Sequence, residues 1–140
     1  MNRRSAQQGV MLLEALIGIL IFSVGILALI DMQATAMRAT IDAKYRSEAS
    51  FLVNEIVGKM WVDRTNLANY ATSPGTPAAC PGAPPCTWIT RVESLLPNAT
   101  GANAPEIAVA TNEVTVTVRW RAPGDAQASN HIAVTQINGS

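Results

Sequence analysis

The sequence is short of the residue types on which most catalytic and metal sites depend. Its 140 residues include one histidine, His131, and two cysteines, Cys80 and Cys86. It contains no glycine-rich phosphate loop, metal-ligand cluster or nucleophile motif. A lone histidine also lacks the partners that a catalytic site needs. We therefore expect no enzyme, no cofactor and no bound metal, and we expect His131 to be an exposed strand residue.

Charge of either sign is also sparse. Ten basic and ten acidic residues give a formal net charge of zero at pH 7, so no general attraction to nucleic acid or anionic lipid is expected. A small basic patch for DNA could still be built from Arg91, Arg119 and Arg121. The interleaved aromatic residues of a single-strand platform are missing, however. A solvated sheet face explains these arginines more simply, so nucleic acid is not an expected partner.

What the sequence does contain is a long apolar run near its start. The stretch from Gly9 to Ile30 reads GVMLLEALIGILIFSVGILALI, with one carboxylate, Glu14. About 20 residues at 1.5 Å each match a hydrocarbon core roughly 30 Å thick, and a helix satisfies every backbone group in lipid. Because Arg3 and Arg4 precede the run, we predict a transmembrane helix over residues 10–30 with a cytoplasmic N-terminus.

Glu14 is the unusual residue of this run, since a carboxylate inside an apolar span costs a few kcal/mol. It either lies at the headgroup level, where a charge costs little, or meets a positive charge supplied by another chain. An ordinary secretory signal peptide is a competing interpretation, with Ala34-Thr35-Ala36 as its small-residue cleavage site. The run is long for that class and contains a glutamate, which argues against it.

The segment QQGVMLLEALIGILIFSVGILAL resembles the N-terminal signature of type IV pilins and pseudopilins. In that family a basic leader ends in glycine, and a glutamate stands fifth in the mature chain. The matching residues are Gly9, Val10 and Glu14, with valine where phenylalanine or methionine is usual. The resemblance implies cleavage after Gly9 by an inner-membrane prepilin peptidase, N-methylation of Val10 and assembly into a filament. It also implies that Glu14 pairs with the new N-terminal amine of a neighbouring subunit.

Beyond the span the sequence becomes amphipathic. Apolar residues recur at spacings of three and four, and no proline occurs before Pro74. We expect one continuous helix from about Val10 to about Arg64, whose second half packs a domain through one apolar stripe. That stripe contains Ile41, Tyr45, Ala49, Leu52, Ile56 and Met60, with Phe51 and Val53 beside it.

A stretch rich in proline, glycine and alanine follows and is predicted to be a loop. Within it, Cys80 and Cys86 enclose the segment PGAPP. A domain outside the cytoplasmic membrane would oxidise such a pair, so we favour a Cys80–Cys86 disulfide. Zinc binding is the alternative, but two cysteines without a nearby histidine provide too few ligands.

The remainder predicts a short helix and then an antiparallel sheet. The helix places four apolar residues on one face and ends at a proline: Trp88, Val92, Leu95, Leu96 and then Pro97. Strands are predicted at residues 106–110, after which Thr111-Asn112 turns the chain, then around EVTVTVRW, and from His131 to Ile137. The middle strand alternates, with Val114, Val116, Val118 and Trp120 on one face. In the last strand, Ile132 and Val134 face one side.

These elements predict an α+β fold, because the apolar face of such a sheet needs a cover and the stripe of the long helix supplies it. The expected organisation is a leader at residues 1–9, a membrane-spanning helix at 10–30, and a periplasmic part at 31–140. That part combines the amphipathic second half of the helix with the small antiparallel sheet.

The segments TWITRVESLLPNA and EVTVTVRW resemble the globular half of PilV-type minor pilins and of the related GspI-type minor pseudopilin of type II secretion. The resemblance implies a non-catalytic inner-membrane subunit that helps to initiate a type IV pilus and is then assembled into it. Its implied partners are other minor pilins and the major pilin through the N-terminal helix, the prepilin peptidase and inner-membrane lipid. A type II secretion pseudopilin and an uncleaved, single-pass anchored periplasmic binding module remain alternatives.

Overall fold

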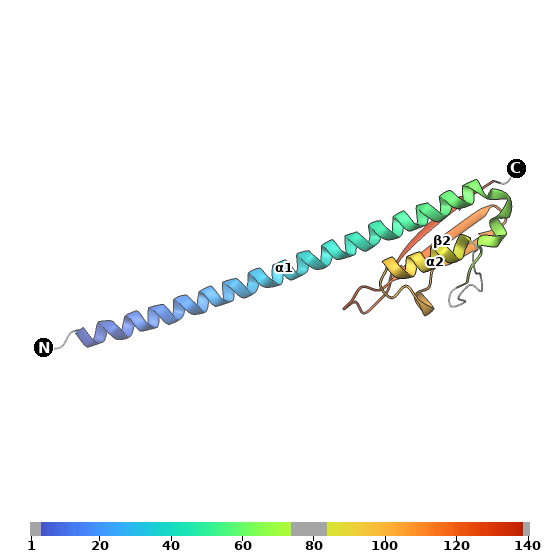
Figure 1. Ribbon diagram of the computed structural model, residues 1–140. Helices are drawn as coiled ribbons and strands as arrows, with labels where there is room; N and C mark the ends of the chain where they lie inside the picture. The colour runs from blue at the N-terminus through green and yellow to red at the C-terminus, as the bar shows by residue number, and fades with distance from the viewer. Residues whose placement is uncertain (1–3, 74–83, 139–140) are drawn as a thin grey trace. The chain divides into compact units, whose positions relative to one another are not determined.

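The computed structural model describes residues 4–73 and 84–138 (Figure 1). The chain forms two compact units, Met1–Ile41 and Asp42–Ser140. The elements in chain order are helix α1 (Arg4–Val62), the 3-10 helix η1 (Arg64–Tyr70), helix α2 (Pro84–Leu95), the 3-10 helix η2 (Gly101–Asn103), and strands β1 (Glu106–Ala110), β2 (Glu113–Trp120) and β3 (Ser129–Gln136).

Helix α1 is continuous over 59 residues, which confirms the predicted long helix. It begins at Arg4, before the predicted start at Val10, because the polar residues of the leader contain no helix breaker. It ends at Val62, where Asp63 leaves helical geometry with φ −109° and ψ 41°. Leader and span therefore share one helix, and the second half of the same helix belongs to the second unit.

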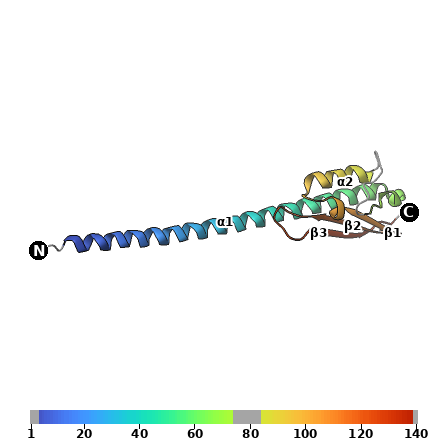
Figure 2. The ribbon, with the colours of Figure 1, turned by 90° about the horizontal axis from the view of Figure 1, so that it is seen from below.

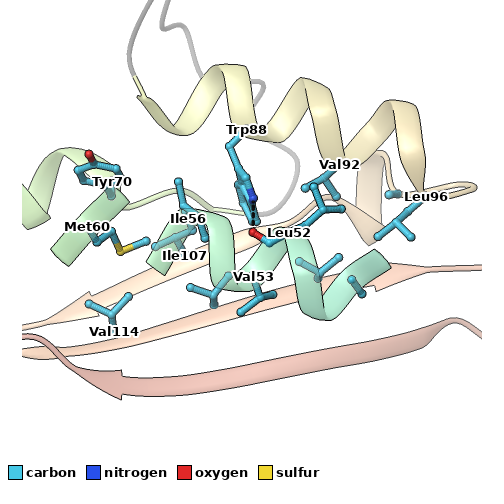
Figure 3. Packing of buried hydrophobic residues seen from close by; sticks show 14 of the residues in the cluster. Leu52, Val53, Ile56, Met60, Tyr70, Trp88, Val92, Leu96, Ile107 and Val114 are labelled. Carbon is cyan, nitrogen blue, oxygen red and sulfur yellow. Dashed lines mark hydrogen bonds between the residues drawn. The ribbon is translucent and has the colours of Figure 1, made fainter. Parts of the chain in front are cut away.

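The second unit has three layers. A sheet of three antiparallel strands in the order β1-β2-β3 forms one layer. The second half of α1 lies on this sheet, and α2 lies on the other side of α1 (Figures 2 and 3). The α+β fold class is as predicted, and the long helix covers the apolar face of the sheet.

Every layer contributes to one hydrophobic core. The four predicted inward residues of β2, Val114, Val116, Val118 and Trp120, are all buried. From α2, Trp88 is fully buried, and its indole Nε1–H donates to the backbone carbonyl of Leu52 on α1 at 2.8 Å (Figure 3). The core comprises Ala49, Leu52, Val53, Ile56, Met60, Leu67, Tyr70, Trp88, Val92, Leu96, Ala99, Ile107, Val114, Val116, Val118, Trp120 and Ile137.

Three apolar residues assigned to packed faces are exposed instead. Ile41 is 44% exposed because it precedes the part of α1 that belongs to the second unit. Phe51 is 56% exposed, because the helix turns it away from the core on the side of Leu52 opposite to the buried Val53. The guanidinium of Arg91 lies 5.8 Å from the centre of the Phe51 ring, so a cation covers this ring. Leu95 is likewise exposed, whereas Leu96 is buried.

Ile132 and Val134 share one face of β3, as predicted, and this face points away from the core. Val116 pairs with Ala133, and Thr117 pairs with Ile132. Because paired residues point to the same face of an antiparallel sheet, Ala133 faces the helix and Ile132 faces away from it. Val134 faces away as well, and Ile132 and Val134 are 54% and 61% exposed.

Candidate functional site

The surface of α1 from Gly9 to Ile30 is apolar except at Glu14 and Ser23, and all of it is exposed. Within the described residues, α1 is the one helix long and apolar enough to cross a membrane. A surface of this kind suits lipid or the apolar faces of neighbouring helices.

Glu14 and Ser23 are the two polar side chains between Val10 and Ile30. The Ser23 hydroxyl donates to the Ile19 carbonyl at 2.7 Å, so its own helix satisfies it. Glu14 is exposed, and among the described side chains no hydrogen bond or ion pair reaches its carboxylate. Any compensation for this charge in an apolar setting must therefore come from outside the described part of the chain.

Glu14 also has a fixed place relative to the predicted cleavage point. It lies four residues after Val10 in continuous helix, so the two side chains share one helical face about 5–6 Å apart at Cβ. The predicted site residues Gly9, Val10 and Glu14 thus lie within about one and a half turns of the helix. Gly18 and Gly25 have open space around them, and no contact with the described residues requires glycine there.

Within the described ranges, the structure gathers no set of side chains that could hold a metal ion. No cluster of three or more His, Cys, Asp or Glu occurs within the described residues. Cys86 is half-buried in the first turns of α2, while Cys80 lies outside the described residues, so the Cys80–Cys86 disulfide stays a prediction. His131 was expected to be exposed and is half-buried, because it shares the helix-facing side of the sheet with its partner Val118.

The three arginines considered for a basic patch do not lie together. Arg91 on α2 forms an ion pair with Glu55 of α1, its Nη1 lying 3.2 Å from Oε2. Arg119 on the outer face of the sheet pairs with Glu106 across β2 and β1 at 3.0 Å. Sequence reasoning missed both carboxylate partners, which come from distant parts of the chain. Arg91 and Arg119 are thus each paired with a carboxylate, and the two pairs lie in different parts of the second unit.

A hollow of about 660 Å³ opens on the surface where the end of α1 meets η1 and the start of α2. The Tyr70 hydroxyl donates to Asp63 Oδ2 at 3.3 Å on its rim. Burial raises the pKa of Tyr70, and the charge of Asp63 and the hydrogen bond to it raise this pKa further. The hollow is lined by Glu55, Gly58, Lys59, Val62, Asp63, Tyr70 and Thr87.

The raised pKa of Tyr70 predicts a loss of stability in alkali. A pKa that is higher in the folded chain than in the unfolded one gives stability that is present below about pH 10 and lost as pH rises through the folded value. Tyr70→Phe should remove this alkaline component and cost on the order of 1 kcal/mol at neutral pH. Urea unfolding of both chains between pH 8 and 11.5 measures it (the range brackets a tyrosine pKa of about 10). Identical pH profiles would contradict the assignment.

Comparison with known families, with curated proteins and with solved structures finds no match. The architecture itself is nevertheless distinctive. A long N-terminal helix, apolar enough to span a membrane, is followed by a small three-stranded antiparallel sheet that its second half contacts. This is a pilin-like architecture.

Proposed function

We propose that this chain is a minor pilin, a non-catalytic subunit that is processed after Gly9 and helps to initiate and assemble a type IV pilus. The observation that carries the proposal is Glu14. It is the polar side chain of the apolar span that its own helix leaves unsatisfied, and it stands five residues after Gly9. The pilin-like architecture supports the same function.

The proposed chemistry follows from the cost of a buried charge. Removal of residues 1–9 leaves a positive amine at Val10, and methylation of that amine preserves its charge. An unpaired carboxylate within lipid costs a few kcal/mol, and a close opposite charge offsets that cost. Two apolar helix surfaces gain little free energy when they associate within lipid. Association becomes favourable when the Val10 amine of a neighbouring subunit lies beside Glu14.

The division of α1 between two units supports separate roles for its halves. The first half would enter the inner membrane and then the filament through its exposed apolar surface. The second half is committed to the core of the small domain and would hold that domain outside the cytoplasmic membrane. Other minor pilins, the major pilin and the prepilin peptidase are the proposed partners, all contacted through the N-terminal half.

Intact-mass spectrometry of the full chain purified from membranes tests this function. We expect a chain that begins at Val10 and carries one added methyl group. In cells without prepilin peptidase, the same chain should keep residues 1–9. A working protein that keeps its leader in normal cells would contradict the proposal and would favour the uncleaved, anchored binding module.

A pseudopilin of a type II secretion system is the second candidate, because Gly9, Val10 and Glu14 fit that machine equally well. Both candidates share cleavage, methylation and helix assembly. Deletion of the chain separates them: loss of surface pili supports the pilus, whereas loss of enzyme secretion with normal pili supports the secretion system.

A further inference from the structure

Strand β3 forms an edge of the sheet, and its backbone pairing can be worked out residue by residue. Ile137 N–H donates to the Asn112 carbonyl at 2.8 Å, just beyond the β2–β3 ladder. Because the residues of an antiparallel strand alternate between bonding inward and pointing outward, Ala133 and the other odd-numbered residues bond to β2. The backbone groups directed away from the sheet belong to Asn130, Ile132, Val134 and Gln136.

The two edges of the sheet differ in how they are covered. On β1, Ile107 is bonded on its outer side, where its carbonyl accepts from Thr72 N–H at 2.9 Å and its N–H donates to Thr72 Oγ1 at 3.0 Å. Among the described residues, no protein group bonds to the outward backbone of Ile132 or Val134. Strand β3 is therefore the open edge.

The side chains of β3 do not prevent a further strand from pairing with this edge. Ile132 and Val134, whose backbone groups point outward, are also more than half exposed on the outer face of the sheet. The strand SNHIAVTQ has no proline, lysine or acidic residue, and its register with β2 runs without a bulge. Natural edge strands usually carry charged residues, proline or bulges that prevent another strand from pairing with them. An edge without these features is suited to pairing with a further strand.

We infer that the outer edge of β3 accepts an extended strand from another polypeptide chain, which becomes a fourth strand of the sheet. The main-chain groups of Ile132 and Val134 would bond to it, as in other cases of strand addition. Because β3 carries no lysine, arginine, aspartate or glutamate, a charge on the incoming strand would be desolvated without a partner. The incoming segment is therefore uncharged along its paired length, with β-branched or other apolar residues facing Ile132 and Val134.

A second copy of this chain fits the edge poorly. Antiparallel pairing of two β3 strands about a two-fold axis would reverse one domain relative to the other. The α1 segment that lies on each sheet would then approach the shared sheet from opposite ends (Figure 2). This step rests on the proposed function, because two chains anchored by α1 in the same membrane must run in the same direction. The strand that pairs with β3 therefore comes from a different polypeptide chain.

The test uses the full chain in cells, with a photo-crosslinking amino acid at Gln136, at the end of the open edge. Val134→Pro removes an outward N–H and leaves the bonds between β2 and β3 intact. Val134→Lys adds a charge without straining the backbone. Ala108→Lys is the matched control, since Ala108, Thr115 and Val134 form one row across the same face, with Ala108 on the opposite edge.

We expect one partner adduct, weakened about tenfold or more by Val134→Pro and Val134→Lys, which corresponds to a loss of at least about 1.4 kcal/mol. The adduct should be unchanged by Ala108→Lys. The inference is overturned by no adduct, by an adduct that survives both Val134 variants, by equal loss in Ala108→Lys, or by an adduct with the mass of two copies. If Val134→Pro fails to fold in a thermal melt, Val134→Lys decides the result.

Leader cleavage in the same cells separates this inference from the proposed function. A chain that begins at Val10 but gives no adduct contradicts strand addition alone. A chain that keeps its leader and still gives an adduct sensitive to Val134→Pro contradicts the pilin assignment alone.

Discussion

Replacing Trp88 with alanine is expected to lower the free energy of unfolding of the domain by about 3–5 kcal/mol. The side chain is fully buried between α2 and α1, so its removal leaves a cavity that two helices must line. Its indole N–H also bonds to the Leu52 carbonyl at 2.8 Å, and this contact is lost as well. Small domains are stable by about 5–15 kcal/mol in total, so the variant should be close to unfolded.

Two control variants separate the effect of losing Trp88 from the effect of losing any tryptophan or any large ring. Trp88→Phe keeps a large ring but loses the indole donor, and we expect a smaller cost of about 1–2 kcal/mol. Trp61→Ala makes the same chemical change at a position that is 47% exposed, so it should cost under about 1 kcal/mol. Urea unfolding of the full chain in detergent, followed by circular dichroism, measures all three. Equal losses for Trp88→Ala and Trp61→Ala would contradict the central place of Trp88 in the core.

Glu14→Ala is expected to leave leader cleavage intact and to reduce assembled filaments by more than about tenfold. Removing the carboxylate lowers the cost of placing α1 in lipid, so membrane insertion should not suffer. On the proposed function, the variant loses the attraction to a neighbouring Val10 amine, and a loss of about 1.4 kcal/mol per contact already changes association tenfold. Sheared surface filaments and membrane fractions, compared by immunoblot, measure the ratio of assembled to unassembled chain.

Ser23→Ala is the matched control for Glu14→Ala, since it removes the other polar group of the span. Its hydroxyl bonds to its own helix at Ile19, so filament assembly should be normal. Normal assembly of Glu14→Ala would remove the proposed role of the carboxylate. Failure of cleavage in that variant would assign Glu14 to recognition by the peptidase instead.

Elements whose pattern is local were predictable from the sequence. Helix α1 follows from a long stretch without breakers, and the inward face of β2 follows from the strict alternation between Val114 and Trp120. The relative placement of Gly9, Val10 and Glu14 was predictable for the same reason, because the three residues lie within about one and a half turns of one helix. Spacing along the chain then fixes their geometry.

The face of β3 could not be predicted in this way. Ile132, Ala133 and Val134 are three consecutive apolar residues, so either face could have been the inner one. The register with β2 decides which face of β3 meets the helix. A shift of one residue would move every side chain of β3 to the opposite face of the sheet. The ion pairs of Arg91 and Arg119 were missed because each joins residues brought together by tertiary packing, which no spacing along the chain reveals.

The middle position of α1 in the domain has a mechanical consequence. A pull along this helix cannot peel it away from one neighbour at a time, because α2 holds it from one side and the sheet from the other. The load is taken in shear by both interfaces together, with the Trp88–Leu52 bond lying across the direction of sliding. A domain pulled through the N-terminal end of this helix would therefore resist its extraction far better than a domain that rested on one side of a helix.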